Sequence, residues 1–312
     1  MLSDVPFYLA GPTASGKSGI AMALAEQVGG EIVNADAFQL YRGLDVLTAK
    51  PCQEDRRRVP HHLYDVLDPA SSCDAQHYRD LALPVIANIA ARGRWPIVVG
   101  GSGLYLKALS HGLADLPAGD EALRAELRAM QMEEKVDRLL RLDPEAGKNV
   151  PLANPRYVER ALEICLLTGK RQSALRQNFA TVKPRGFGVQ LSWEREALYD
   201  RINRRVLQML QGGALAEVSD LQGDSGVAKA IGVRELRAHL AGEMSLEEAI
   251  AAMQQSTRHY AKRQGTWFRR ETWLQTVCLD ASSTPESAVA KILDLFPCLK
   301  TPPSPPSQSK SI

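Results

Sequence analysis

Residues 11–18 read Gly11-Pro12-Thr13-Ala14-Ser15-Gly16-Lys17-Ser18 and directly follow the short apolar run Phe7–Ala10. Between Ile20 and Val28, apolar residues then recur at helical spacing, so the glycine-rich stretch joins a strand to a helix. In that context the pattern Gly-x-x-x-x-Gly-Lys-Ser is a full Walker A phosphate-binding loop. Backbone N–H groups and the dipole of the following helix favour a polyphosphate there. The molecule that carries the phosphates stays open.

Two more apolar segments, Glu31–Asp36 and Pro96–Gly101, alternate with helical patterns along the chain. This alternation predicts an α/β fold, a P-loop NTPase-like parallel sheet flanked by helices. One helical pattern covers Leu81–Ile89, where Pro84 should kink the helix or mark its start. Because such sheets bind ligands at the carboxyl ends of their strands, we expect the functional residues there.

The middle of the chain changes to helical patterns with dense mixed charge. A helix start is clear at Asn154-Pro155, an N-cap side chain followed by proline at the first helical position. We therefore expect a P-loop catalytic core over residues 1–116 and 187–300, with an all-α insertion domain at 117–186. The Pro/Ser/Lys-rich segment 301–312 is expected to be a disordered tail.

The composition is that of an ordinary globular protein, with 312 residues, 45% hydrophobic, 24% charged and a net charge of +2. Any nucleic-acid contact must therefore come from local basic patches. No apolar run reaches the roughly 18–20 residues of a membrane span. The 5 cysteines are scattered without metal-binding spacing. We expect a cytoplasmic monomer with no membrane partner.

Asp36 is the first candidate for catalysis. An NTPase or kinase normally offers an apolar strand that ends in a metal-binding Asp. Here the strand at 96–99 runs into Gly100–Gly103, which does not fit the Gly-x-Ser-x-Gly motif of hydrolases, whereas the other strand ends in Asp36. Asp36 can be a general base, a displaced metal ligand or a strand-end cap, and its place at the ligand edge favours the base.

Seven segments together resemble the bacterial tRNA dimethylallyltransferases, in order from about residue 7 to 275. They are Gly11–Ser18, Asp36–Asp45, Thr48–Pro51, His61–Asp65, Gly100–Tyr105, Asn154–Arg156 and Ala261–Arg269. The resemblance implies transfer of a dimethylallyl group from dimethylallyl diphosphate, with release of diphosphate. The acceptor would be the exocyclic N6 amine of the adenosine 3′ to the anticodon, in the anticodon stem-loop of a tRNA.

The resemblance also implies roles for individual residues. Asp36 would be the general base, with Ser102 near the reaction centre and Lys17 on the leaving group. Gly11 to Ser18 would bind the diphosphate, together with Arg201 or Arg205, between which the sequence does not decide. The Ser18 hydroxyl would bind Mg²⁺, the expected cofactor.

The implied tRNA contacts fall into a few short segments. They are Asp36, Ala37, Phe38, Gln39, Ser102, Arg124, Arg156, Tyr157, Val158, Glu159, Arg160, Lys229, Ala230, Ile231, Gly232, Val233, Arg234, Arg258, Lys262 and Arg263. Charge pattern alone favours solvated helix faces for the arginines and lysines among them, and it is the resemblance that favours RNA contacts.

The chain departs from the family pattern in four places. Ala37 stands where serine is usual, Leu47 replaces glycine, Ser102 replaces threonine and Val233 replaces tyrosine. Three other functions compete with tRNA prenylation: a P-loop small-molecule kinase, a nucleotide-gated RNA-binding module, and an adenylate isopentenyltransferase that acts on free nucleotide. The predicted insertion and the basic C-terminal helices favour a macromolecular acceptor.

Overall fold

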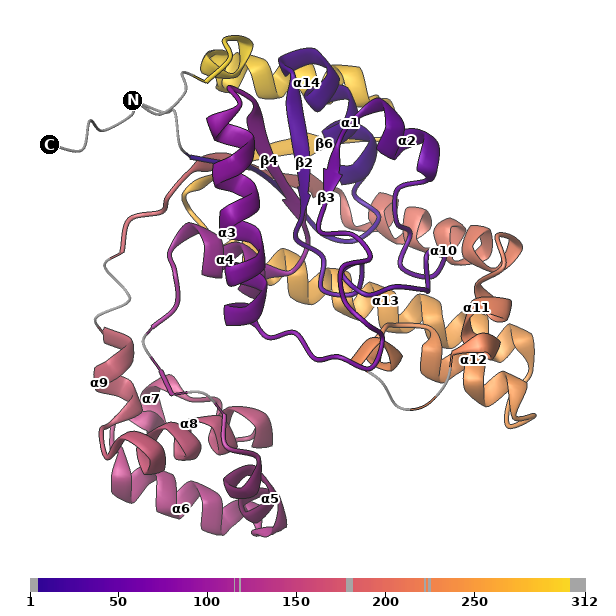
Figure 1. Ribbon diagram of the computed structural model, residues 1–312. Coiled ribbons are helices and arrows are strands. Elements are labelled where there is room, and N and C mark those ends of the chain that lie inside the picture. Colours follow the sequence, from indigo (N-terminus) through magenta and orange to yellow (C-terminus); the bar gives the residue numbers. More distant parts are fainter. Residues whose placement is uncertain are drawn as a thin grey trace, which may run out of the picture. The chain divides into compact units, whose positions relative to one another are not determined.

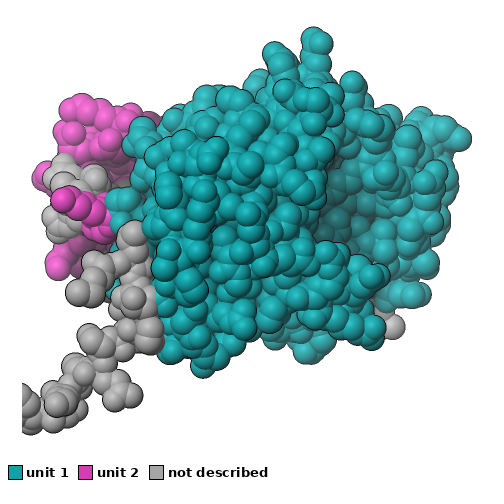
Figure 2. Space-filling model, turned by 90° about the horizontal axis from the view of Figure 1, so that it is seen from above, with its two compact units in different colours: residues 1–110, 184–312 teal, residues 111–183 magenta. Residues whose placement is uncertain are grey.

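A computed structural model describes residues 5–114, 116–117, 119–177, 182–221, 223 and 226–303. The chain divides into two compact units, residues 1–110 with 184–312, and residues 111–183 (Figure 2). The second unit coincides with most of the predicted insertion and lies slightly earlier in the chain. Of the tail expected to be disordered, residues 304–312 lie outside the described residues.

The first unit contains a six-stranded parallel sheet of order β3-β2-β4-β1-β5-β6 (Figure 1). This confirms the predicted P-loop-type α/β fold. β1 lies at the centre, between β4 and β5, so the loop that follows it opens at the carboxyl edge of the sheet. The strands are β1 (Phe7–Ala10), β2 (Gly30–Asn34), β3 (His61–His62), β4 (Trp95–Gly100), β5 (Phe187–Trp193) and β6 (Leu274–Leu279).

Helices cover both faces of this sheet. α1 and α14 pack against each other on one side, and α3 and α4 pack together on the other (Figure 1). α10 and α13 also lie side by side. The helices are α1 (Lys17–Val28), α2 (Gln53–Arg58), α3 (Ala75–Ala91), α4 (Gly103–Ser110), α10 (Arg195–Gln211), α11 (Ala214–Asp220), α12 (Val233–Leu240), α13 (Leu246–Phe268) and α14 (Pro285–Leu295), with 3₁₀ turns at Gly226–Lys229 and Pro297–Lys300.

Pro84 lies in the middle of α3, so the prediction that it might mark the start of this helix is wrong. The helix begins one residue after Asp74, whose carboxylate accepts the backbone N–H of His77 at 2.8 Å. This side-chain cap satisfies one of the free N–H groups of the first turn. The Asp74 cap places the start of α3 about two turns before Pro84.

The core of the first unit lies between the sheet and α1 and α14. Phe7, Leu9 and Ile97 are fully buried in it, as the uninterrupted apolar runs of β1 and β4 predict for central parallel strands. The chain continues past α14 along this core, and the carbonyl of Thr301 accepts a hydrogen bond from the indole of Trp95 at 3.0 Å. Thr301 is therefore fixed to the core rather than part of a free tail.

All the regular elements of the second unit are helices in its described residues, as predicted. Asn154 caps α8 through a hydrogen bond from the Arg156 N–H at 3.1 Å, and Pro155 takes the first helical position. Leu127, Leu139 and Leu162 form its core. The helices are α5 (Glu121–Ala129), α6 (Met132–Leu142), α7 (Ala146–Asn149), α8 (Pro155–Thr168) and α9 (Gln172–Gln177).

Across the described ranges, no helix combines the length and apolar character needed to cross a bilayer.

Candidate active site

A pocket of about 540 Å³ opens where the loops after β1, β2 and β4 meet. The phosphate loop forms one wall and the segment that begins at Asp36 forms another. α10 and α13 close it with apolar side chains, among them Ile202, Val206 and Met253. The site therefore combines an anion-binding end with an apolar wall.

The phosphate loop has the backbone that its glycines predict, with φ of 89° at Gly16 and a left-handed φ of 61° at Ala14. Lys17 Nζ donates to the carbonyl oxygens of Gly11 and Pro12 at 2.9 and 2.7 Å. Burial lowers the pKa of Lys17 to about 7, opposed by Asp36 and assisted by Arg205. An anion placed in the loop would restore the full charge of this ammonium group.

The structure distinguishes the two candidate arginines on α10. Arg205 lines the pocket, and its guanidinium lies 3.4 Å from the Thr13 hydroxyl. Arg201 instead donates to the carbonyl of Ala14 at 2.8 Å and stacks over the Trp193 ring at 4.3 Å. Arg205 is thus placed to meet a bound anion, and Arg201 supports the loop from behind.

Asp36 is held by the buried side chain of Asn34. The Asn34 amide oxygen accepts the Asp36 N–H at 2.8 Å, while its NH₂ group donates to the carbonyls of Asp36 and Leu63 at 3.2 and 2.9 Å. One Asp36 carboxylate oxygen accepts the N–H of Phe38 at 3.0 Å, so it also acts as the predicted cap. Asp36 lines the same pocket as Lys17, so its other carboxylate oxygen can serve a reacting group there.

Ser102 lies beside Asp36, and its hydroxyl accepts the backbone N–H of Ala37 at 3.1 Å. The hydroxyl of Tyr260, a pocket residue that the sequence did not single out, lies close enough to Ser102 for Ser102 to lower its pKa. Burial and the charge of Asp36 raise the pKa of Tyr260, although hydrogen bonding with Ser102 and Gln264 opposes the shift. Tyr260 therefore remains a neutral hydrogen-bond donor in the pocket.

Gln264 is a second residue that sequence reasoning missed. Its amide oxygen accepts the Thr13 N–H at 2.8 Å, and its NH₂ group donates to the carbonyl of Gly101 at 2.9 Å. The side chain thereby joins α13 to the loops after β1 and β4. A Cβ at Gly101 would lie 2.3 Å from Gln264 Nε2, so any larger residue here would displace the Gln264 amide.

The predicted RNA-contacting residues of the first unit differ in how exposed they are to solvent. Lys229, Lys262 and Arg263 are exposed, and Lys229 and Arg263 also line the pocket. Arg234 is exposed and pairs with Glu235, while Arg258 is bound to the side chain of Asn203 at 2.7 Å. Ala230, Gly232 and Val233 are buried, although Ala230 also lines the pocket. The predicted RNA contact of Val233 stays a prediction, and its buried side chain does not support it.

Within the second unit, Arg124 and Arg160 both bind the buried carboxylate of Glu163, at 2.8 and 2.5 Å. Glu159 pairs with Lys135 at 2.7 Å, and Val158 is fully buried in the core. A direct RNA contact by the Val158 side chain is therefore excluded by its packing. On the same helix, the predicted contacts Arg156 and Tyr157 are exposed.

The oxygen atoms in the pocket that could bind a metal suit Mg²⁺ better than a metal ion whose ligands are all protein side chains. Among the described residues no three His, Cys, Asp or Glu side chains gather as a metal site. The pocket offers the exposed Ser18 hydroxyl and the Asp36 carboxylate. Mg²⁺ retains waters and is usually held by one or two protein groups plus substrate phosphates. Ser18 therefore fits the role the sequence predicts for it.

A phosphate loop, a carboxylate opposite it and an apolar wall at the carboxyl edge of a parallel sheet define the class, a P-loop-type α/β enzyme. The sequence profile of IPP transferases matches residues 39–271. A tRNA dimethylallyltransferase of Geobacter metallireducens is 47% identical, covering 84% of this chain and 88% of the relative. One from Akkermansia muciniphila is 42% identical, covering 92% and 98%. The chain belongs to the IPP transferase family.

Solved structures agree with this placement. The tRNA isopentenylpyrophosphate transferase of Bacillus halodurans superposes with a TM-score of 0.70 at 36% identity, covering 95% of this chain and 97% of that one. A eukaryotic dimethylallyltransferase described as acting on tRNA gives a TM-score of 0.81 at 26% identity, covering 92% and 77%. The resemblance predicted from the sequence motifs is confirmed.

Proposed function

We propose that this chain transfers a dimethylallyl group from dimethylallyl diphosphate to the N6 amine of the adenosine 3′ to the anticodon of a tRNA. The observation that carries the proposal is the single pocket in which the phosphate loop, Asp36 and the apolar wall of α10 and α13 meet. A prenyl diphosphate needs an anionic end and an apolar end in line, and the pocket offers both. A tRNA substrate also implies a cytoplasmic enzyme, which we expect to act as a monomer.

In the proposed reaction, the N6 lone pair attacks C1 of the dimethylallyl group. The bond between C1 and the diphosphate oxygen breaks, and the diphosphate leaves with the bonding electrons. The N6 proton passes to the free oxygen of Asp36, which acts as the general base. Lys17 and Arg205 stabilise the negative charge that grows on the departing diphosphate. Mg²⁺ bound at Ser18 would supply further Lewis-acid stabilisation of the same charge.

The phosphate loop would hold a leaving group in this scheme, not a nucleotide to be hydrolysed. The apolar side chains of Ile202, Val206, Met209 and Met253 support this choice over a small-molecule kinase, whose second substrate is polar. The relatives that are named tRNA dimethylallyltransferases support it over an RNA-binding module without chemistry. The helical unit at 111–183 supports a macromolecular acceptor over free adenylate.

For the tRNA itself, we propose contacts from exposed basic and aromatic side chains. In the helical unit these are Arg156 and Tyr157, and in the first unit Lys229, Lys262 and Arg263. Basic side chains would bind the phosphates, and an exposed tyrosine can stack on an unpaired base. The anticodon loop would have to present its target base out of the stack to reach a pocket lined by Asp36.

The proposal is tested by incubating the chain with an anticodon stem-loop RNA, Mg²⁺ and dimethylallyl diphosphate. Mass spectrometry of the digested nucleosides should find the prenyl group on the adenosine 3′ to the anticodon. A parallel assay with ATP should find negligible hydrolysis, with or without RNA. Robust ATP hydrolysis without prenyl transfer would return the kinase or ATPase function to first place.

A further inference from the structure

Two facing loops beside the pocket hold four non-glycine residues in left-handed backbone conformation. Leu44 and Ala49, each with φ of 52°, lie in the loop that follows β2. Leu63 and Asp65, with φ of 63° and 58°, follow β3. Such residues are strained, persist only where their surroundings impose them, and cluster at functional sites. The surroundings of these loops therefore need an explanation.

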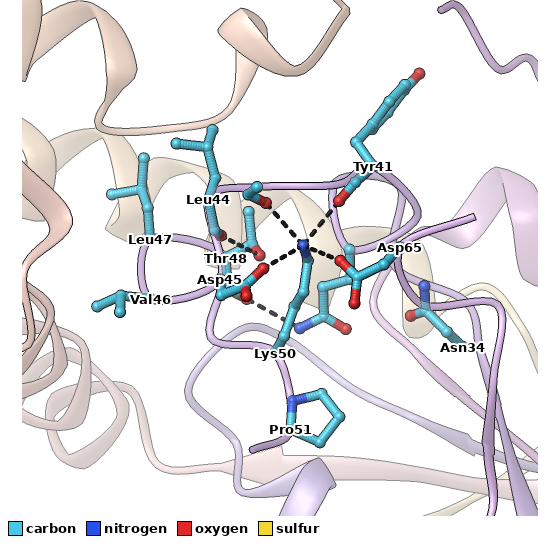
Figure 3. A network of polar contacts seen from close by, with 12 residues as sticks. Asn34, Tyr41, Leu44, Asp45, Val46, Leu47, Thr48, Lys50, Pro51 and Asp65 are labelled. Carbon is cyan, nitrogen blue, oxygen red and sulfur yellow. Dashed lines mark hydrogen bonds and ion pairs between the residues drawn. The ribbon is translucent and has the colours of Figure 1, made fainter. Parts of the chain in front are cut away.

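The ammonium group of Lys50 joins the two loops (Figure 3). Its Nζ lies 2.7 Å from the carbonyl oxygens of both Tyr41 and Gly43, 2.6 Å from Asp45 Oδ1 and 2.5 Å from Asp65 Oδ1. The Lys50 side chain is only 1% exposed. Burial favours a raised pKa for Asp65, yet its hydrogen bonds to Lys50 and Arg56 hold that pKa below its ordinary value. The Lys50 ammonium group therefore binds carbonyl and carboxylate oxygens of both loops at the same time.

A second charged side chain holds the same loop from the other side. The carboxylate of Glu217, on α11, accepts the backbone N–H groups of Val46 and Leu47 at 2.8 and 3.0 Å. Lys50 thus binds oxygen atoms of the loop, and Glu217 binds its N–H groups. We call Lys50 and Glu217 together the loop clamp.

The clamped loop fixes the side chain of Gln39. Its amide NH₂ donates to the carbonyl oxygens of Thr48 at 2.9 Å and Ala49 at 3.1 Å. Because both neighbours are acceptors, the nitrogen of the amide faces them, and Oε1 is left to accept a hydrogen bond from another donor. Gln39, Thr48 and Ala49 all line the pocket that contains Asp36. The clamp therefore determines which atom of Gln39 is offered to a bound base.

We propose that Lys50 and Glu217 are positioning residues that hold Gln39 Oε1 as an acceptor for the 6-amino group of the target adenine. This inference rests on the proposed function. On its readable edges adenine has one donor, the N6 amine, and its other polar atoms are acceptors. A base with oxygen at position 6 would bring two acceptors together. A site built for a donor rejects such analogues strongly because its own polar group is left unpaired.

The test compares binding of two anticodon stem-loops that carry adenosine or inosine at the target position. Wild type should prefer adenosine by at least about tenfold. Lys50→Met and Gln39→Leu should reduce that preference by at least about threefold, leaving the part due to Asp36, while affinity for dimethylallyl diphosphate changes by less than about twofold. The matched control is Lys107→Met, which removes a lysine paired with Glu271 at 3.2 Å outside the pocket and should keep the wild-type preference.

Glu217→Gln gives a milder perturbation of the same loop, because it removes the charge and keeps one acceptor. It should lower the adenosine preference in the same direction, and it replaces Lys50→Met if that variant does not fold. If wild type prenylates RNA while Lys50→Met and Glu217→Gln keep the full preference for adenosine over inosine, the inferred positioning role of the loop clamp is wrong. The proposed function then still stands. If wild type neither prenylates nor distinguishes the two stem-loops, the proposed function fails and the clamp fails with it.

Discussion

One carboxylate oxygen of Asp36 accepts the backbone N–H of Phe38 at 3.0 Å, so half of this side chain is occupied in shaping its own turn. The turn is closed further by Asn34, which accepts the Asp36 N–H. A base whose backbone and one oxygen are fixed presents its second oxygen in a defined direction. General bases benefit from such fixed geometry, because the proton acceptor must lie within hydrogen-bond reach of the reacting group.

Asp36→Asn should therefore remove the base without disturbing the turn, since the amide oxygen can still accept the Phe38 N–H. We expect single-turnover prenyl transfer to fall by about 10²–10⁴-fold, the usual contribution of general-base catalysis. Affinity for the stem-loop RNA should stay within about twofold of wild type. Rapid-quench transfer assays and filter binding measure the two quantities, and unchanged turnover would exclude Asp36 as the base.

The lowered pKa of Lys17 predicts proton uptake when the diphosphate binds. In the free protein burial brings this pKa to about 7, so Lys17 is largely neutral at pH 8. A bound anion raises the pKa again, so binding at pH 8 should take up a proton and affinity should fall as pH rises above about 7. Calorimetry in buffers of different ionisation enthalpy measures the uptake. At pH 6, where Lys17 is already charged, uptake by this group should vanish, and Lys17→Met should lack the additional uptake that wild type shows at pH 8.

Arg201 and Arg205 should separate into two phenotypes. Arg205→Gln removes a guanidinium that faces the pocket, so donor affinity and transfer should fall by at least about tenfold with little change in Tm. Arg201→Gln removes the bond to the Ala14 carbonyl and the stacking on Trp193, so Tm should fall as well. Thermal melts with and without dimethylallyl diphosphate measure both effects. Equal loss of Tm in the two variants would contradict the separation.

Gly101→Ala should disturb the phosphate loop through Gln264. The new Cβ would lie 2.3 Å from Gln264 Nε2, which must move and release the Thr13 N–H. Donor affinity should drop by about tenfold or more, as expected when a positioning contact in a catalytic site is lost. Gly265→Ala is the matched control, because its Cβ meets only Arg269 at 3.9 Å. An alanine inside α13 should leave binding intact and stabilise the helix by about 0.5–1 kcal/mol.

The sequence predicts those parts of the site in which the functional residues belong to the same short segment as a recognisable strand or helix. The phosphate loop and Asp36 each follow directly from a buried strand, and parallel topology brings such strand ends together. Gln264 lies 251 positions from Thr13, and Glu217 lies 171 from Val46. No local pattern marks those long-range hydrogen bonds, so only the folded chain reveals them.

The errors have an equally physical origin. The resemblance implies RNA contacts for every residue from Arg156 to Arg160, but one turn of a helix cannot present every residue to the same side. Val158 faces the core for that reason. β3 has two residues and is too short to show any periodicity in the sequence. Arg201 and Arg205 lie one turn apart on the same face of α10, so only the folded structure shows which of them contacts the pocket.

The two arginines of α8 give the last prediction. Arg156 is exposed, whereas Arg160 pairs with Glu163, whose side chain is 1% exposed and also binds Arg124. Arg156→Ala should weaken stem-loop binding and reduce the slope of log K against log salt by about 0.7–0.9, the value for one phosphate contact. Its Tm should not change.

Arg160→Ala should instead destabilise the protein by about 1–3 kcal/mol, because the buried carboxylate of Glu163 loses a charged partner. Any loss of RNA affinity should then be recovered in the double variant Arg160→Ala with Glu163→Gln, which removes the buried charge that Arg124 alone would have to balance. Exposed Arg141, at the end of α6, supplies the control for non-specific charge loss, and Arg141→Ala should leave both slope and Tm unchanged. Urea titrations and binding at four salt concentrations, about 50 to 200 mM, measure these quantities. A salt slope that changes in Arg160→Ala and not in Arg156→Ala would reverse the roles of the two arginines.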